Sequence, residues 1–144
     1  MRSDYLNENS GATFGLKKKV EPITVARTLS NDDSGKVFRL DSAGGAYSIT
    51  LPTASTGEDG VYYKLIVEEE TPTAIITVAA GSAIISLVMK DAGGNASNST
   101  AGTQVSNILI GTTAEKGDYV NLLFANGEWL AECMSSIDNA VTTS

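Results

Sequence analysis

The sequence predicts an all-β protein: a single β-sandwich or jelly-roll-like domain of about nine short strands, preceded by an extended N-terminal arm. Runs of β-branched and aromatic residues from Val20 onward are separated by clusters of Gly, Asn, Asp and Ser, which is the usual pattern of strands and turns. Several of these runs alternate apolar and polar residues with the period of two that a half-buried strand requires. With 144 residues, the chain is long enough to bury a core as one domain. We expect an arm at residues 1–20, a β-sandwich domain at 21–135 and a polar C-terminal tail at 136–144.

The expected strands share apolar runs of four to eight residues bounded by turn residues. They cover residues 23–29, 37–40, 46–51, 61–68, 74–79, 83–89, 105–110, 119–125 and 128–134. In the first of them, Ile23, Val25 and Leu29 are expected to share one face. The clearest alternation lies at 46–51, which Pro52 ends.

Two neighbouring segments, 74–79 and 83–89, are continuously apolar around Gly81. Such runs are typical of strands that are covered on both faces, or of one side of a subunit interface. Helix is the alternative. The abundance of Ile and Val and the short length of each run favour strand.

The last two strands are expected to form a hairpin around Asn126-Gly127, because this dipeptide suits a two-residue turn with positive φ at both positions. The second strand of this hairpin contains the single cysteine, Cys133, in alternation with Trp129 and Ala131. We expect Cys133 to be a buried small hydrophobic residue rather than a nucleophile. A single cysteine cannot form an intrachain disulfide, which suits synthesis in a reducing cytosol.

The absence of histidine limits the chemistry that the chain can perform. The commonest general base, the histidine metal ligand and histidine-based triads are all missing. A carboxylate pair could still hydrolyse glycosides, but the candidate acids lie in turns or at strand ends, where they commonly serve solubility and turn geometry: Asp32, Asp33, Asp41, Glu58, Asp59 and the run 68–70. We therefore predict a protein that is not an enzyme, with no cofactor and no metal. A carboxylate-dependent enzyme is one alternative, and loops at 31–34 and 91–95 leave calcium binding as another.

Charge and hydropathy exclude two classes of partner. The formal net charge of −7 argues against a nucleic-acid binder, which needs clustered Lys and Arg on a basic surface. No apolar run approaches the roughly 18 to 20 residues that cross a bilayer, and residues 1–20 lack the apolar block of a signal peptide. We expect no nucleic acid, no membrane and no secretion.

The N-terminal arm differs in charge from the rest of the chain. Residues 1–20 have a balance of +2, which leaves −9 for residues 21–144. Apolar side chains also occur in the arm, and a segment that only maintained solubility would not need them. We therefore predict a binding arm, with these contact residues: Tyr5, Leu6, Phe14, Leu16, Lys17, Lys18 and Lys19. The alternatives are a disordered terminus and a first edge strand of the domain.

Two regions of the sequence resemble small structural proteins of tailed-bacteriophage virions. Residues 36–52 (KVFRLDSAGGAYSITLP) resemble their strand, glycine turn and strand unit, and residues 115–122 (EKGDYVNL) with 126–129 (NGEW) resemble their closing strand and hairpin. The resemblance covers roughly residues 20–135 and rests on turn and strand signals. It implies a capsid decoration or cement protein, often a homotrimer, that binds the major capsid protein on the outer surface of the virion head after synthesis in the host cytoplasm.

Related β modules also occur in tail fibres and capsid fibres, which suggests an alternative function. The chain would then recognise a host surface glycan through Tyr62, Tyr63 and the loop at 91–103. Adjacent residues of a strand point to opposite faces, so one of the two tyrosines is expected to be in the core.

Overall fold

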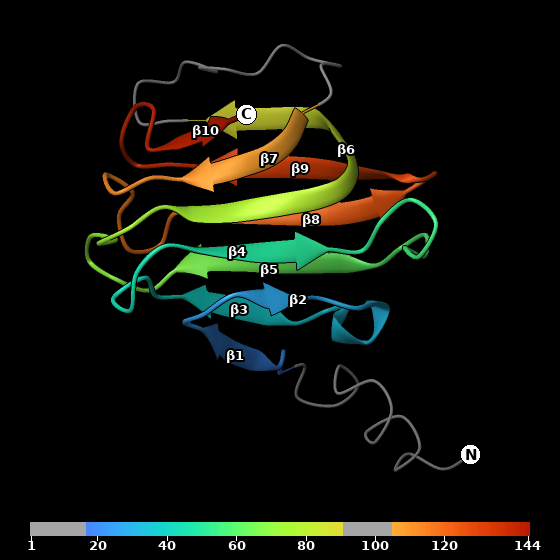
Figure 1. The fold of residues 1–144 in the computed structure, drawn as a ribbon, viewed down its shortest axis with the longest axis horizontal. Coiled ribbons are helices and arrows are strands. Elements are labelled where there is room, and N and C mark those ends of the chain that lie inside the picture. Colours follow the sequence, from blue (N-terminus) through green and yellow to red (C-terminus); the bar gives the residue numbers. More distant parts are fainter. Residues whose placement is uncertain (1–16, 91–104) are drawn as a thin grey trace.

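The computed structural model describes residues 17–90 and 105–144, and side-chain surroundings for residues 17–80 and 105–144. This part of the chain contains ten strands and one short 3-10 helix, with no α-helix (Figure 1). The strands are β1 (Val20–Ile23), β2 (Arg27–Thr28), β3 (Val37–Leu40), β4 (Tyr47–Leu51), β5 (Tyr62–Val67), β6 (Ile76–Lys90), β7 (Val105–Ile110), β8 (Tyr119–Ala125), β9 (Glu128–Met134) and β10 (Val141–Thr143), and the helix η1 is Asn31–Asp33. The all-β prediction is confirmed, with ten strands rather than about nine.

The strands form two facing sheets, so the predicted β-sandwich is confirmed. The first sheet has the order β1-β3-β5-β8-β9, and the second consists of β2, β4, β6, β7 and β10 (Figure 1). From β1 to β6 the chain alternates between the sheets, and strands that follow one another within each sheet pair in parallel. A jelly roll is built from antiparallel Greek keys, whereas these strand pairs are parallel. Of the two expected architectures, the chain therefore adopts the β-sandwich.

Strand β6 connects the two sheets. Its first residues pair with β4 and β7, and its last residues pair in parallel with β9. The two apolar runs expected at 74–79 and 83–89 are therefore one strand of 15 residues, and the preference for strand over helix is confirmed. The pairing with β7 shifts register between Ala79 and Ile84, around Gly81, where Figure 1 shows the strand curving. Such irregularities bend a strand, which lets β6 serve both sheets.

The core lies between the sheets and centres on Trp129 in β9. Its ring stacks on Tyr63 at a centroid distance of 5.4 Å and meets Phe124 edge-on at 5.0 Å. The indole Nε1–H donates to the Pro52 carbonyl at 2.9 Å, so the polar atom of this buried ring is satisfied. Packing at Trp129 therefore joins β5, β8, β9 and the end of β4.

One residue of the expected core is on the surface. Ile23 and Leu29 are buried as predicted, but Val25 is 69% exposed. The prediction of a shared face assumed one continuous strand. Instead, β1 ends at Ile23 and the chain bends at Val25 before β2 begins in the other sheet, so the period of two is interrupted there.

The predicted hairpin is confirmed. Strands β8 and β9 pair in register from Tyr119↔Met134 to Ala125↔Glu128. Asn126 and Gly127 have φ values of 53° and 80°, as the two-residue turn requires. Cys133 is buried, and burial raises the pKa of its thiol to about 12, which fits the predicted inert residue.

The sequence predicts a polar tail at residues 136–144, but in the structure this segment contains a strand. Residues Val141–Thr143 form β10, which pairs antiparallel with β7. Ala140 and Val141 are both buried. Two apolar residues in a polar stretch show too little periodicity to predict a strand. Their burial, together with the backbone hydrogen bonds between β10 and β7, attaches the segment to the second sheet.

Candidate functional site

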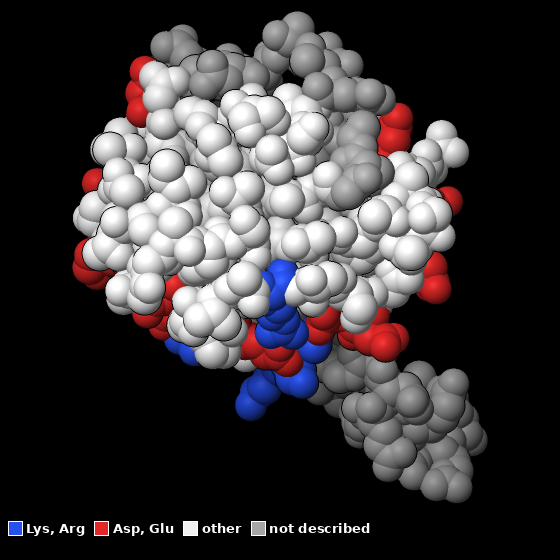
Figure 2. All heavy atoms as spheres, viewed as in Figure 1, with Lys and Arg blue, Asp and Glu red and all other residues white. Residues whose placement is uncertain are grey.

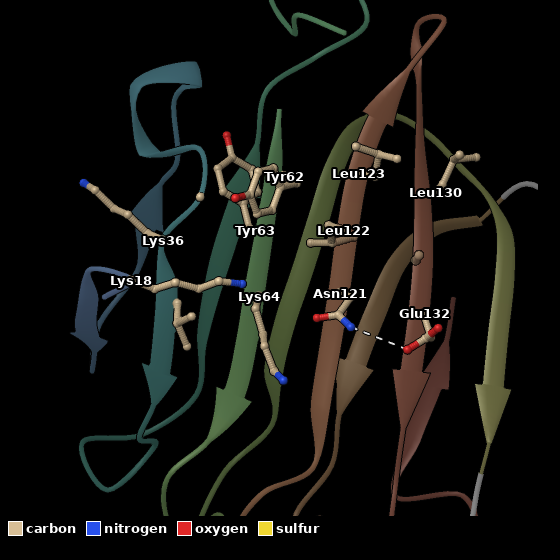
Figure 3. Close-up of a pocket in the computed structure, with 13 residues that line it drawn as sticks. Lys18, Lys36, Tyr62, Tyr63, Lys64, Asn121, Leu122, Leu123, Leu130 and Glu132 are labelled. Atoms are coloured by element: carbon tan, nitrogen blue, oxygen red, sulfur yellow. Dashed lines mark hydrogen bonds between the residues drawn. The ribbon is translucent and has the colours of Figure 1, made fainter. Parts of the chain in front are cut away.

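A groove with a volume of about 590 Å³ lies on the outer face of the first sheet, the side away from the core (Figure 3). Strands β3, β5, β8 and β9 form its floor, and one side chain comes from the segment before β1. The groove is lined by Lys18, Gly35, Lys36, Val37, Tyr62, Tyr63, Lys64, Asn121, Leu122, Leu123, Leu130, Ala131 and Glu132.

Strand register arranges the outward side chains of the groove in rows. Tyr62 lies opposite Leu123, and Leu123 opposite Leu130, which makes an apolar row across three strands. Tyr62 is 44% exposed and Leu123 is 42% exposed. Apolar groups this open, side by side, are what a binding surface offers to a partner.

The next row is polar. Lys64 lies opposite Asn121, which lies opposite Glu132. Glu132 Oε1 accepts from Asn121 Nδ2 at 3.5 Å and from the Tyr119 hydroxyl at 3.4 Å, and Lys64 Nζ lies 4.4 Å from the centre of the Tyr119 ring. These hydrogen bonds are long and therefore weak. The polar atoms can turn to a bound molecule at little cost.

Burial and the Glu132 carboxylate both raise the pKa of Tyr119. The phenol therefore stays protonated at neutral pH and can act as a hydrogen-bond donor next to the groove. The polar row presents donors on Asn121 and Lys64 and an acceptor on Glu132, and the neighbouring Tyr119 adds a further donor.

The end of the predicted arm borders this groove. Lys17, Lys18 and Lys19 are exposed, and Lys18 lines the groove with its Nζ 6.0 Å from the centre of the Tyr62 ring. The Lys19 carbonyl accepts a hydrogen bond from the Val37 N–H at 2.9 Å, which fixes the segment to β3. We call residues 17–19 the basic root. The other predicted arm residues, Tyr5, Leu6, Phe14 and Leu16, lie outside the described residues.

Beside the basic root, a cluster of opposite charges holds β1 and β3 together. Glu21 contacts Lys19, Arg27 and Lys36 at 3.0 to 3.2 Å. The hydrogen bond from Lys19 is the largest influence on the carboxyl of Glu21, and with Lys36 and Arg27 it lowers the pKa to about 2 against the opposing effect of burial. A carboxylate held this firmly in its charged form is a poor proton donor or base at neutral pH.

Asp33 is engaged in the same way. Its carboxylate accepts from Lys36 Nζ at 2.6 Å, from Arg27 at 3.2 Å and from the Ser30 N–H at 3.1 Å. Burial opposes ionisation, but these partners hold the pKa of the carboxyl below its usual value. The contacts give this acidic residue of the 31–35 turn a structural role.

The two adjacent tyrosines point to opposite faces, as the sequence predicts. Tyr62 is exposed in the groove and Tyr63 is buried against Trp129. The Tyr63 hydroxyl donates to the Ser30 carbonyl at 2.7 Å, and burial raises its pKa. Of the tyrosine pair expected in a glycan site, only Tyr62 presents its ring to the surface, and the loop at 91–103 lies outside the described residues.

Four residues of the groove were not predicted from the sequence: Asn121, Leu123, Leu130 and Glu132. Their alternation with buried neighbours in β8 and β9 indicates that they face outward. The alternation of residues in β8 and β9 does not predict that β5 lies next to β8. This strand pairing places Tyr62 and Lys64 beside the four outward residues of β8 and β9.

No protein-family model matches the chain, and no curated protein matches it significantly. Within residues 17–90 and 105–144, no group of three or more acidic or cysteine side chains is placed to hold a metal ion. No helix in that part of the chain is long and apolar enough to cross a membrane.

Proposed function

We propose that the chain is a structural protein of a tailed-phage virion, a capsid decoration or cement protein that binds the assembled head and stabilises it. The observation that carries this proposal is the position of the basic root, which lies beside the groove and its exposed apolar row on an otherwise acidic sandwich. The resemblance of residues 36–52, 115–122 and 126–129 to virion proteins also supports it. The partner is the major capsid protein, and the chain acts on the outer surface of the head.

The mechanism is binding without chemistry. The lysines of the basic root attract an acidic region of the shell, and the apolar row of the groove supplies surface that is removed from water on contact. The resemblance implies a homotrimer. Several weak contacts in one oligomer act at high effective concentration, so modest contacts at each arm suffice to hold the shell.

Charge reversal in the basic root tests this proposal. We expect Lys18→Glu to weaken binding to assembled heads that lack the chain by about tenfold, because an attraction at the rim of the contact becomes a repulsion. Lys18 is exposed, so the melting temperature should not change. Co-sedimentation of the purified chain with such heads, at several salt concentrations, measures the effect.

Lys116→Glu is the matched control. Lys116 is also exposed, and its only described ion pair is with Glu70, which is also exposed and far along the chain from the root. The control makes the same change in net charge, so it should bind nearly as well as the unaltered chain. Failure of the unaltered chain to bind heads would refute the proposed function. Equal binding by the two variants would show that the basic root does not contribute to head binding.

A truncation that lacks residues 1–16 extends the test to the predicted arm contacts. It keeps the Lys19 carbonyl bond to Val37 and the Lys19–Glu21 ion pair, so the sandwich should retain its stability. If the arm binds, the truncated chain folds but binds heads more weakly. Undiminished binding would rule out Tyr5, Leu6, Phe14 and Leu16 as contacts.

The groove also favours a second candidate function, a fibre or spike module that recognises a host surface glycan. The exposed Tyr62 ring offers a stacking face, and Lys64, Asn121 and Glu132 offer donors and an acceptor in the next row. Glycan sites combine these features. On a glycan array we expect signals that Tyr62→Ala abolishes and Tyr62→Phe retains, because stacking needs the ring and not the hydroxyl. Uniform absence of signal would exclude this candidate.

A further inference from the structure

Ion pairs engage most of the lysine and arginine side chains that the structure describes. Within residues 17–80 and 105–144, the cations at ion-pair distance from a carboxylate are Lys19, Arg27, Lys36, Arg39 and Lys116. In Figure 2, Lys and Arg side chains accordingly gather with Asp and Glu side chains at the lower edge of the molecule. The other lysines in these two ranges, Lys17, Lys18 and Lys64, have no such partner among the described residues. Since the chain has 17 acidic and 10 basic side chains, lysines without an acidic partner are the exception.

Two of these unpaired lysines, Lys18 and Lys64, line the groove. Figure 3 shows Lys18 extending toward β5, the strand that carries Lys64. The nearest described aromatic ring is that of Tyr62 for Lys18, at 6.0 Å, and that of Tyr119 for Lys64, at 4.4 Å. An aromatic ring attracts a cation but does not neutralise its charge. The groove therefore presents two uncompensated positive charges on an acidic protein.

The apolar row and the polar row of the groove are two residues apart on each strand. Lys64 follows Tyr62 on β5, and Asn121 precedes Leu123 on β8. Residues i and i+2 of a strand point to the same face and lie roughly 6.6 Å apart. An extended segment that lies along β5 has the same repeat. Its own side chains at i and i+2 therefore come opposite the apolar row and the polar row.

We propose that the groove binds an extended segment of the major capsid protein in which an acidic residue lies two positions from a large apolar residue. The apolar side chain packs on Tyr62 and Leu123, which are both largely exposed. The carboxylate is bound by Lys64, and Lys18 adds attraction at the rim. The inference rests on the proposed function, because it names the chemistry of the capsid segment that the groove recognises.

Glu132 restricts where the acidic residue of the partner can lie. It ends the polar row on β9, two strand spacings or roughly 10 Å from Lys64. A carboxylate is repelled over Glu132 and attracted over Lys64, so the segment is held at the β5 side of the groove. Neutral glycans carry no charge for the two lysines to bind. The unpaired lysines therefore favour an acidic peptide segment over a neutral glycan.

An NMR titration of the isotope-labelled full chain with the peptide acetyl-SDSFS-amide tests the proposal. This peptide has an aspartate two positions before a phenylalanine. We expect the backbone amide signals of Tyr62, Lys64 and Leu123 to shift, with a dissociation constant of about 1 mM, because so short a peptide buries little surface. The neutral peptide acetyl-SNSFS-amide should bind at least about threefold more weakly. Added salt should reduce the difference between the two peptides.

Lys64→Gln removes the charge that is expected to bind the carboxylate. This variant should bind the acidic peptide only as well as the neutral one. Lys116→Gln is the matched control, because it removes the same charge from an exposed lysine whose described ion-pair partner is Glu70, and neither residue lines the groove. The control should bind both peptides as the unaltered chain does. The spectra of the free variants report whether each is folded.

Four results would overturn the proposal: no shifts at about 10 mM peptide, shifts outside the groove only, equal binding of the two peptides, or equal binding by the two variants. Glucuronic acid that shifts the same signals at lower concentration would assign the groove to an acidic glycan instead. The titration contains no virion heads, so its failure is distinct from that of the proposed function. Head binding without peptide binding would refute the inference alone. Peptide binding without head binding would refute the major capsid protein as the partner.

Discussion

Trp129→Ala is expected to lower the free energy of unfolding by about 3 to 5 kcal/mol, a range typical of large aromatic residues truncated in a core. Trp129 is fully buried and contacts Tyr63 and Phe124. Truncation removes both ring contacts, leaves a cavity between the sheets and deprives the Pro52 carbonyl of its indole donor. Urea denaturation followed by circular dichroism measures the loss.

Leu123→Ala is the control for this prediction. Leu123 lies in β8, next to Phe124, but its side chain is 42% exposed on the groove. Since half-exposed side chains can be truncated without leaving a closed cavity, the expected cost is about 1 kcal/mol or less. Should the two variants lose similar stability, Trp129 would not be the centre of the core. If Trp129→Ala does not fold, Trp129→Phe provides a milder truncation that should still cost more than Leu123→Ala.

Gly57→Ala is expected to destabilise the fold by about 1 to 3 kcal/mol, which is the usual cost of overpacking a core. A Cβ added at Gly57 would lie 2.6 to 2.8 Å from three atoms of the Phe124 ring. That ring cannot move aside freely, because it meets Trp129 edge-on at 5.0 Å. Either the turn at Gly57 or the aromatic cluster must shift, and thermal melting of the variant reports the cost.

Gly44→Ala is the matched control. Gly44 is also a turn glycine with an ordinary φ, but the nearest atom to an added Cβ is the Thr24 carbonyl oxygen at 3.8 Å, which is normal contact. The substitution removes only the extra freedom of glycine in the unfolded chain, so it should be neutral or stabilise by up to about 1 kcal/mol. Equal melting temperatures for the two variants would show that the Phe124 ring does not restrict Gly57.

Local features of this protein were predictable because they depend on neighbours in the sequence. Tyr47, Ile49 and Leu51 are buried while the residues between them are exposed, as their period of two indicates. The Asn126-Gly127 turn and the burial of Cys133 follow from equally local signals. The preference for strand over helix around Gly81 rested on residue type and also holds.

Features that depend on which strands become neighbours were not predictable. The two runs around Gly81 form one strand, because β6 has partners in both sheets, and no short pattern records such partners. Val25 is exposed because the chain changes sheet there, and β10 forms because β7 has a free edge in the second sheet. The groove likewise exists only where β5 meets β8.

By itself, the sequence determined the all-β class, most strand positions, the closing hairpin and the absence of histidine chemistry. These follow from side-chain period, turn preference and composition, which act over a few residues. Only the tertiary structure decided the parallel winding of the two sheets and the position of Lys18 beside Tyr62. The physical reason is that strand pairing is made by backbone hydrogen bonds and by burial between distant segments, which a pattern along one strand does not specify.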